Sequence, residues 1–265
     1  MHPRFRVVIP ARYASTRLPG KLLRLLAGRT LLEHVYRRAL VCGASDVVIA
    51  TDDVRIQKAA EGFGAIVCMT SAEHPSGTDR LAEVARQCAW PDDDLVINLQ
   101  GDEPQIPPVL IQQVATALDK HPDAGIATAC ARIHDLTEMF EPSTVKVVRD
   151  AQGYALYFSR APIPYHRELF GAIDRADSVE LPAELPSAIG WFRHIGLYAY
   201  RVEVLCRYPQ LAPAPAEQAE SLEQLRALWH GIRVYVAEAT EVPPAGVDTE
   251  ADLQRVAAAF ERSTQ

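Results

Sequence analysis

Short apolar runs and helical patterns alternate through the first half of the chain. Four runs are rich in β-branched residues and nearly continuous in apolar character, as is typical of strands buried on both faces: Arg6–Pro10, Asp46–Thr51, Ala65–Met69 and Asp94–Leu99. Between them, apolar residues at helical spacing predict helices over Thr30–Val41, Val54–Phe63 and Thr78–Ala89. This alternation indicates an α/β fold with a mostly parallel central sheet and helices on both faces.

The second half of the chain has a different pattern. Two short apolar runs flank the turn residues 150–153 and predict a hairpin. An acidic, proline-rich excursion, Ala161–Pro186, follows it. The remaining predicted elements are a strand over His194–Tyr200, a helix over Glu217–Trp229, a strand over Ile232–Ala237 and a helix over Thr249–Phe260. We interpret residues 1–265 as a single domain with an inserted arm, and we expect part of Ala161–Pro215 to form a dimer surface.

Composition narrows the class of protein. The chain has 265 residues, of which 48% are hydrophobic, and no apolar run approaches the roughly 20 residues that span a bilayer. The expected location is therefore the cytoplasm. The five cysteines (Cys42, Cys68, Cys88, Cys130 and Cys206) form no C-x-x-C pair, so we expect buried, reduced thiols rather than disulfides or a zinc site.

Charge is distributed unevenly along the chain. The net charge is −7, yet residues 1–40 carry nine Lys or Arg against one acid, which leaves −15 on the rest. A basic segment on an otherwise acidic protein favours a local anion site over nucleic-acid binding, which usually needs a broader basic face. For Arg37 and Arg38 a simple surface role is as good an interpretation.

The strongest candidate for that anion site is the segment that follows the first strand. It contains Arg12, Arg17 and Lys21 among small residues, and open α/β sheets bind ligands at the carboxyl ends of strands. Small residues let backbone N–H groups approach phosphate oxygens, while Arg and Lys supply charge. The segment is neither a P-loop nor a G-x-G-x-x-G turn, which disfavours a Rossmann dehydrogenase.

Two acidic positions are candidate metal ligands. Asp102 follows the fourth predicted strand, and Asp248 precedes the last predicted helix. A hard cation such as Mg²⁺ takes one or two carboxylates together with substrate phosphate oxygens. Asp102 and its neighbour Glu103 are also suited to a turn, and Asp248 alone to a helix N-cap.

Further polar residues are candidates for binding the substrates. Ser76, Gly77 and Thr78 open a predicted helix and are suited to contacts with a base and ribose, or to a simple helix cap. Arg80 is suited to pairing with phosphate or with Asp79. A dispersed polar set in the second half comprises Arg160, His194, Tyr198, Glu223 and Gln224, and each of these alone is as easily structural.

Seven segments, in this order, closely resemble the 3-deoxy-manno-octulosonate (Kdo) cytidylyltransferases of bacterial lipopolysaccharide synthesis. They are IPARYASTRLPGK, HPSGTDR, NLQGDEP, VKVV…GYALYFSRAPIP, RHIGLYAYR, LEQLR…G and GVDTEADL. The resemblance covers nearly the whole chain, although acylneuraminate cytidylyltransferases share the first segment in looser form. Leu22 departs from the proline usual in the family, and residues 171–186 match only weakly.

The resemblance implies a Rossmann-like nucleotidyltransferase fold and a Mg²⁺-dependent homodimer that converts CTP and Kdo to CMP-Kdo and pyrophosphate. It implies that Arg12 and Lys21 contact the CTP phosphates and, with Asp102 and Asp248, form the catalytic set. Asp102 and Asp248 would hold magnesium. Around cytosine and ribose it places Ala11, Ser76, Gly77, Arg80 and Gln100, and around the sugar Gln105, Arg160, His194, Tyr198, Glu223 and Gln224.

Three alternatives remain open at this point. In the first, the acceptor is another acidic sugar, such as sialic acid or an amino analogue of Kdo. In the second, the chain is a non-catalytic nucleotide sensor on the same fold. The third and most remote alternative is a dehydrogenase. A sensor does not need two carboxylates for a metal, so the joint presence of Asp102 and Asp248 argues against that reading.

Overall fold

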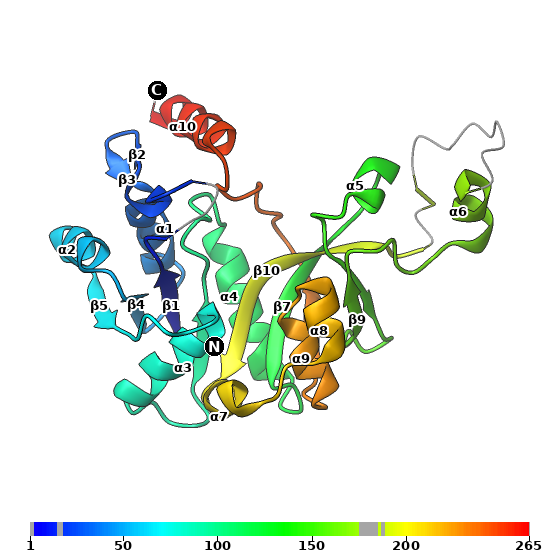
Figure 1. Ribbon diagram of the computed structural model, residues 1–265, viewed down its shortest axis with the longest axis horizontal. Coiled ribbons are helices and arrows are strands. Elements are labelled where there is room, and N and C mark those ends of the chain that lie inside the picture. The colour runs from blue at the N-terminus through cyan, green and yellow to red at the C-terminus, as the bar shows by residue number, and fades with distance from the viewer. Residues whose placement is uncertain (1–2, 15–17, 175–184, 187–188, 265) are drawn as a thin grey trace. The chain divides into compact units, whose positions relative to one another are not determined.

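The computed structural model describes residues 3–14, 18–174, 185–186 and 189–264 (Figure 1). The chain divides into two compact units. Unit 1 comprises Met1–Ala127, Leu197–Gln210 and Thr240–Gln265, and unit 2 comprises Thr128–Gly196 and Leu211–Ala239. The interpretation of residues 1–265 as a single domain remains a prediction.

A mostly parallel sheet forms the centre of unit 1. Strand β1 (Phe5–Ala11) pairs in parallel with β4 (Asp46–Thr51) on one side and with β6 (Leu95–Asn98) on the other. β4 pairs in parallel with β5 (Ile66–Met69), and the last residues of β10 (Phe192–Arg201) run antiparallel to β6. Val7, Val8 and Ile9 of β1 are fully buried, as the continuous apolar run predicts.

Helices cover both faces of this sheet. α1 (Leu31–Leu40) and α2 (Val54–Gly62) connect strands that follow one another in a single direction across the sheet. The chain then reverses direction through α3 (Gly77–Gln87) to reach β6. Because such crossovers are right-handed, α3 lies on the opposite face from α1 and α2. Predicted and observed bounds of these elements agree within about two residues, the usual uncertainty of helix ends.

Side-chain caps explain where these three helices begin. Thr30, Asp53 and Ser76 each occupy the N-cap position, and each side chain accepts a hydrogen bond from a backbone N–H in the first turn. Thr30 and Glu33 are the predicted capping-box pair, and the Thr30 hydroxyl accepts from the Glu33 N–H.

The rest of unit 1 contains several elements that the sequence pattern did not reveal, together with the predicted closing helix, which is confirmed as α10 (Glu250–Thr264). Helix α4 (Pro108–Lys120) follows β6, begins with proline at its first position, and contacts both β6 and α1. A 3₁₀ turn, η1 (Lys21–Leu23), and a short hairpin, β2 (Leu25–Leu26) and β3 (Arg29–Thr30), precede α1. α7 (Val202–Arg207) and a second 3₁₀ turn, η2 (Tyr208–Gln210), follow β10, and α10 ends the unit.

Unit 2 is built around antiparallel pairing. The predicted hairpin is confirmed as β8 (Lys146–Arg149) and β9 (Ala155–Ser159), and β8 also pairs with the first residues of β10. β7 (Ile126–Arg132), which was not predicted, lies between β10 and β11 (Val234–Glu238). α5 (Leu136–Phe140) and α6 (Arg167–Asp174) complete this part; residues 175–184 of the predicted excursion lie outside the described residues.

The predicted helix Glu217–Trp229 is wrong as a single element. The chain forms α8 (Pro215–Glu220) and α9 (Gln224–Trp229), separated at Ser221, which adopts a left-handed conformation with φ 52°. A left-handed residue ends a helix. The apolar spacing that suggested one helix arises because Leu222 and Leu225 are both buried just after the break.

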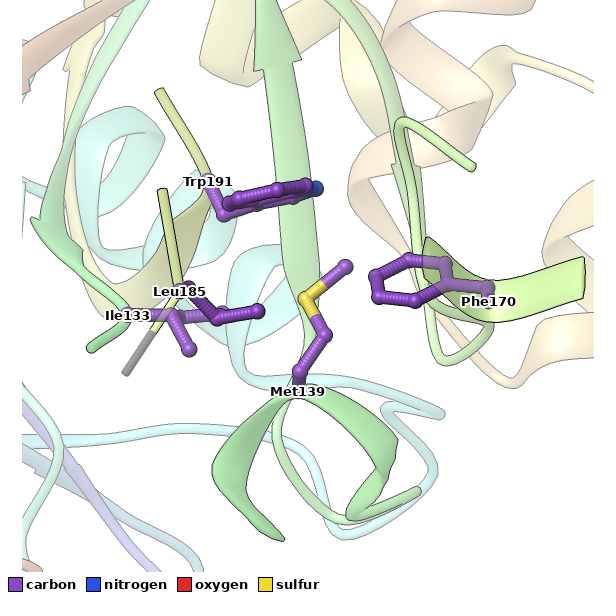
Figure 2. Close-up of a cluster of buried hydrophobic side chains, with 5 residues drawn as sticks. All are labelled: Ile133, Met139, Phe170, Leu185 and Trp191. Carbon is purple, nitrogen blue, oxygen red and sulfur yellow. The ribbon is translucent and has the colours of Figure 1, made fainter. Parts of the chain in front are cut away.

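A separate hydrophobic cluster stabilises the part of unit 2 that contains α5 and α6. Its buried members are Ile133, Met139, Phe170, Leu185 and Trp191. Figure 2 shows the Met139 side chain extending from α5 toward the rings of Trp191 and Phe170. The indole N–H of Trp191 donates a 2.9 Å hydrogen bond to the Pro164 carbonyl, so the buried ring keeps a polar partner.

The cysteines agree with their prediction only in part. All five are free, as expected, but only Cys42 and Cys130 are buried, whereas Cys68 and Cys206 are half-buried and Cys88 is exposed. Cys88 is the C-cap residue of α3 and lies beyond Ala85, the last buried residue of that helix. Over the described ranges, no helix combines the length and the apolar character that crossing a membrane requires.

Candidate active site

A cavity of about 420 Å³ opens at the carboxyl ends of β1 and β6 in unit 1. Strand order changes direction at β1, since β4 and β6 lie on its two sides, and such switch points are where open α/β sheets bind ligands. The residues that line the cavity are Pro10, Arg12, Ala14, Lys21, Leu22, Pro75, Ser76, Gly77, Gln100, Gly101, Asp102 and Asp248. Seven of the predicted nucleotide or metal residues thus line one cavity: Arg12, Lys21, Ser76, Gly77, Gln100, Asp102 and Asp248. Arg17 lies outside the described residues.

Lys21 links the two predicted metal ligands. Its Nζ donates to Asp102 Oδ2 at 2.7 Å, to Asp248 Oδ1 at 3.0 Å and to the Val247 carbonyl at 3.0 Å. Burial opposes the lysine charge, but the two carboxylates outweigh it, so the pKa of Lys21 is raised above its ordinary value. Lys21 is therefore a fixed cation at the cavity wall.

Backbone geometry brings Asp102 and Asp248 together. The Val247 N–H donates a 2.9 Å hydrogen bond to the Asp102 carbonyl, which joins the loop after β6 to the segment before α10. Gly246 packs against this contact, because a Cβ atom there would lie 3.1 Å from the Asp102 carbonyl oxygen. The predicted proximity of the two carboxylates is thus present in the fold.

The two carboxylates fit the requirements of a magnesium ion that also binds substrate phosphate. Both converge on one cation, the ammonium of Lys21, and both reach the cavity that would hold the phosphates. In the described part of the chain, no group of three or more His, Cys, Asp or Glu side chains is arranged to hold a metal. A protein-only cage is therefore not built here, and substrate oxygens would complete the coordination.

Arg12 is oriented by the loop that precedes α3. One guanidinium nitrogen donates to the carbonyls of His74 and Ser76, the latter at 3.3 Å. The Ser76 hydroxyl caps α3 and donates to Asp79 at 2.5 Å, and Gly77 lies against Pro10. Arg12, Ser76 and Gly77 all line the cavity, as predicted for the nucleotide site.

Leu22, which replaces the proline usual in the family that the sequence resembles, lines the cavity. It is 5% exposed, and a Cβ atom at Gly101 would lie 3.3 Å from Leu22 Cδ2 and 3.2 Å from the Pro10 carbonyl. A side chain at position 101 would therefore need the Leu22 side chain or the Pro10 carbonyl to shift by a few tenths of an ångström. The leucine fills the space beside Gly101 and holds the end of the Lys21 loop by packing.

Two predicted nucleotide residues do not line this cavity. Ala11 is fully buried at the end of β1. Arg80 is also fully buried, and it donates to Asp52 at 3.1 Å and to the Thr70 hydroxyl. Asp79, its other predicted partner, instead contacts Ser76. These contacts join α3 to Asp52 and to Thr70, which begins the loop before α3. The contact of Arg80 with CTP remains a prediction.

The predicted sugar residues belong to both units. In unit 1, Gln105 lies in the turn after β6, and Tyr198 is paired with Asn98 across β10 and β6. In unit 2, Arg160 follows β9, His194 lies on β10, and Glu223 and Gln224 begin α9. Their common role in binding a sugar remains a prediction.

Arg160 is held by a network that the sequence did not reveal. Its Nε donates to the Glu220 carbonyl at 2.8 Å, and another guanidinium nitrogen donates to the Pro142 carbonyl at 3.0 Å. The Glu220 carboxylate accepts from the Arg160 backbone N–H and from the Ser159 hydroxyl. Glu220 is the last residue of α8 and comes directly before the break at Ser221 in the predicted helix.

His194 is held as a neutral ring. Its Nε2 lies 2.9 Å from the Thr128 hydroxyl, and its ring contacts Phe158 edge-on at 5.1 Å between centroids. Desolvation lowers the pKa of His194 to about 3. Near neutral pH the ring is therefore uncharged, and it contributes hydrogen bonds rather than charge.

Comparison with known proteins agrees with this geometry. The family model described as Cytidylyltransferase matches residues 6–234. The chain belongs to the cytidylyltransferase family. This cytidylyltransferase is 54% identical over 255 residues to the 3-deoxy-manno-octulosonate cytidylyltransferase of Halorhodospira halophila, which covers 96% of each chain. It is 55% identical over 258 residues to that of Marinobacter nauticus, with 97% of each chain covered.

A solved structure supports the same assignment. The cytidylyltransferase superposes with a TM-score of 0.86 on CMP:2-keto-3-deoxy-manno-octonic acid synthetase complexed with CTP, at 42% identity over 98% of this chain and 100% of that one. The chain is therefore a nucleotidyltransferase, and the predicted α/β fold with a mostly parallel central sheet is confirmed.

Proposed function

We propose that this cytidylyltransferase activates 3-deoxy-manno-octulosonate with CTP, giving CMP-Kdo and pyrophosphate for lipopolysaccharide synthesis. The observation that carries the proposal is the convergence of Lys21, Asp102 and Asp248 on one point of a cavity at the strand switch. Relatives about as long as this chain, and more than half identical to it, are 3-deoxy-manno-octulosonate cytidylyltransferases.

The cavity residues suit the nucleotide. Arg12 and Lys21 supply positive charge for the triphosphate, and Ser76, Gly77 and Gln100 supply polar and close-packed surface for cytosine and ribose. Lys21 and Arg12 are both fixed by hydrogen bonds before the substrate arrives. Charge that is already oriented needs little reorganisation during reaction, which is the main way such sites stabilise a transition state.

The reaction is an in-line displacement at phosphorus. The anomeric hydroxyl oxygen of the sugar forms a bond to the α-phosphorus of CTP, the bond from that phosphorus to the bridging oxygen breaks, and pyrophosphate leaves. The hydroxyl proton passes to solvent. Arg12 and Lys21 stabilise the departing pyrophosphate, so positioning and charge neutralisation account for most of the rate. No side chain acts as a nucleophile.

Asp102 and Asp248 would hold Mg²⁺, since both carboxylates contact the Lys21 ammonium and line the cavity that would hold the triphosphate. When bound, the ion neutralises phosphate charge and polarises the α-phosphate. Binding of the sugar by Gln105, Arg160, His194, Tyr198, Glu223 and Gln224 is part of the same proposal. The proposal also includes assembly as a homodimer through part of Ala161–Pro215 and a cytoplasmic location.

A panel of acidic sugars tests the proposal. The protein is incubated with CTP, Mg²⁺ and Kdo, an amino analogue of Kdo, or sialic acid, and pyrophosphate release is measured. We expect the highest kcat/KM with Kdo. A clear preference for another sugar would replace the acceptor while retaining the activity, and CTP binding without pyrophosphate from any sugar would indicate a nucleotide sensor.

A further inference from the structure

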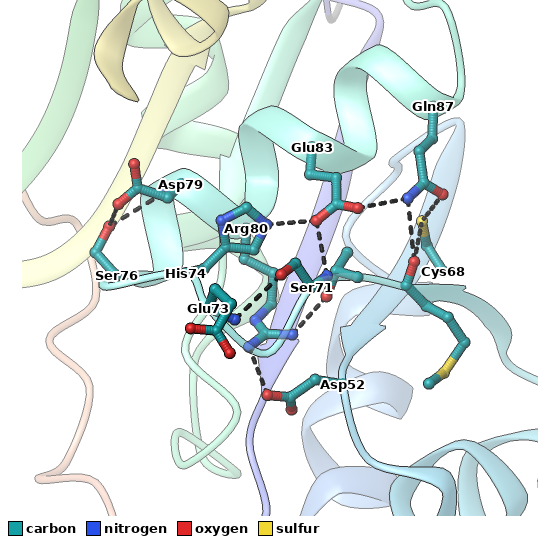
Figure 3. A network of polar contacts seen from close by, with 12 residues as sticks. Asp52, Cys68, Ser71, Glu73, His74, Ser76, Asp79, Arg80, Glu83 and Gln87 are labelled. Carbon is teal, nitrogen blue, oxygen red and sulfur yellow. Dashed lines mark hydrogen bonds and ion pairs between the residues drawn. The ribbon is translucent and has the colours of Figure 1, made fainter. Parts of the chain in front are cut away.

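Glu83 joins α3 to the loop that forms one wall of the cavity. One carboxylate oxygen accepts a 2.9 Å hydrogen bond from the Ser71 N–H and also contacts His74 Nε2. The other accepts a 2.8 Å bond from Gln87, whose amide also donates to the Met69 carbonyl at 3.1 Å. Figure 3 shows Glu83 reaching from α3 to His74, with Gln87 one turn further along the helix.

These contacts fasten a segment that has no regular secondary structure of its own. Residues 70–76 run from the end of β5 to the N-cap of α3 without a strand or helix. Burial raises the pKa of Glu83, but the Ser71 N–H, His74 and Gln87 outweigh it, and the pKa is lowered. Glu83 is therefore an ionised carboxylate, which makes its hydrogen bonds strong ones.

The opposite side of the same loop faces Arg12. The carbonyls of His74 and Ser76 accept from the Arg12 guanidinium, and Pro75 and Ser76 line the cavity. His74 thus contacts Glu83 through its ring and Arg12 through its backbone. Glu83 itself is not among the residues that line the cavity.

We propose that Glu83 is a positioning residue, which holds the His74 loop so that the carbonyls of His74 and Ser76 orient Arg12 toward the triphosphate of CTP. The inference rests on the proposed function for the identity of the nucleotide. A guanidinium has a planar fork of donors, so its orientation decides whether it contacts phosphate productively. Without Glu83, the Arg12 side chain would still be present but would sample other orientations.

Two substitutions separate positioning from simple stability. Glu83→Ala removes every contact of the carboxylate, and we expect the Kd of CTP, measured by calorimetry, to rise about 10-fold, within the range for a misplaced binding group. Glu83→Gln keeps one oxygen where both Ser71 and His74 contact the side chain and loses only the acceptor for Gln87, so its Kd should stay within about 3-fold of wild type. Arg86→Ala, at an exposed position of α3, is the matched control and should bind normally.

A double-mutant cycle with Arg12→Ala tests whether Glu83 affects CTP binding through Arg12. If Glu83 acts through Arg12, adding Glu83→Ala to Arg12→Ala should change the Kd of CTP by less than about 2-fold, because coupled residues are not additive. A general structural role would instead lower the melting temperature and weaken binding equally in both backgrounds. Equal effects in the two backgrounds, or an unchanged Kd in Glu83→Ala, would overturn the inference.

CTP binding is measured without a sugar, so a wrong acceptor in the proposed function leaves this experiment intact. A wild-type chain that binds CTP but transfers it to no sugar would refute the proposed reaction while the cycle still tests Glu83. A wild-type chain that binds no CTP would refute both.

Discussion

The ammonium of Lys21 lies 2.7 Å from Asp102, a residue 81 positions away in the sequence. Asp248, near the end of the chain, accepts from the same ammonium at 3.0 Å. Three segments that are far apart in the sequence therefore meet at one charged point. The single positive charge of Lys21 offsets part of the charge of the two carboxylates before substrate binds. The same point supplies both the cation and the anions that a triphosphate and its metal ion require.

Lys21→Ala should have opposite effects on turnover and on metal binding. Turnover should fall about 10²-fold or more, the scale of losing one oriented donor to the transition state. Without the lysine, Asp102 and Asp248 would repel one another, so binding of Mn²⁺ in the absence of nucleotide should become tighter than in wild type. Steady-state kinetics and electron paramagnetic resonance titration measure the two effects. Unchanged turnover would remove Lys21 from the catalytic set.

Gly101→Ala should disturb the cavity. The new methyl group would lie 3.3 Å from Leu22 and 3.2 Å from the Pro10 carbonyl, closer than most such contacts allow. We expect a destabilisation of about 1–3 kcal/mol together with a higher KM for CTP. Leu22→Ala in the same chain should recover part of the binding, because it removes the flexible neighbour. Thermal unfolding and kinetics of the single and double variants test this, and strictly additive effects would argue against the packing explanation.

Arg80→Met should act on stability more than on chemistry. Arg80 is fully buried beside Asp52, so removing it leaves a carboxylate without its partner, at a cost of about 3–5 kcal/mol. Asp52→Asn in the same chain should restore a substantial part of that loss. Denaturant unfolding measures both. If Arg80→Met kept wild-type stability but lost CTP binding, the sequence-based role of Arg80 at the nucleotide would be supported instead.

His194 should make the protein less stable in mild acid. Its pKa is lowered to about 3 in the folded chain, whereas an unfolded histidine titrates near about 6.5. Between these values the unfolded state binds more protons, so stability is lost as the pH falls below about 6.5, by on the order of 1 kcal/mol per pH unit. His194→Gln should therefore lose less stability between pH 7 and pH 5 than wild type does.

The control for this prediction is His230→Gln, which changes an exposed histidine of the same unit. Its unfolding free energy should follow the wild-type dependence on pH. Parallel curves for wild type and His194→Gln would contradict a His194 that is held neutral in the folded chain.

The sequence predicted unit 1 well because its elements carry strong local signals. β1 and β4 are continuous β-branched runs, and α1 to α3 each begin with a side-chain cap that is legible in the sequence. Helix α4 was missed even though Leu110, Ile111, Val114 and Leu118 are buried at helical spacing. Its cap residue, Pro107, supplies no side-chain hydrogen bond that would mark the start.

The charged residues of the site could be predicted from the sequence, but most of their side-chain partners could not. Lys21, Asp102 and Asp248 share a chemistry that pointed to phosphate and metal. The position of Arg80 was not predictable, because whether a helix-borne arginine faces a cavity or the interior depends on the tertiary position of Asp52. Glu220 and Glu83 were missed for the same reason: each acts on a neighbour that only the folded chain brings close.

The most direct test of the proposed reaction is ³¹P NMR of a mixture of the protein, CTP, Kdo and Mg²⁺. We predict that the resonances of CTP are replaced by one phosphodiester resonance of CMP-Kdo and by pyrophosphate in equal amounts. Chelation of Mg²⁺ should stop the conversion, and so should Asp102→Asn with Asp248→Asn. Persistence of CTP in the complete mixture, or conversion that is unaffected by chelation and by both substitutions, would contradict the account.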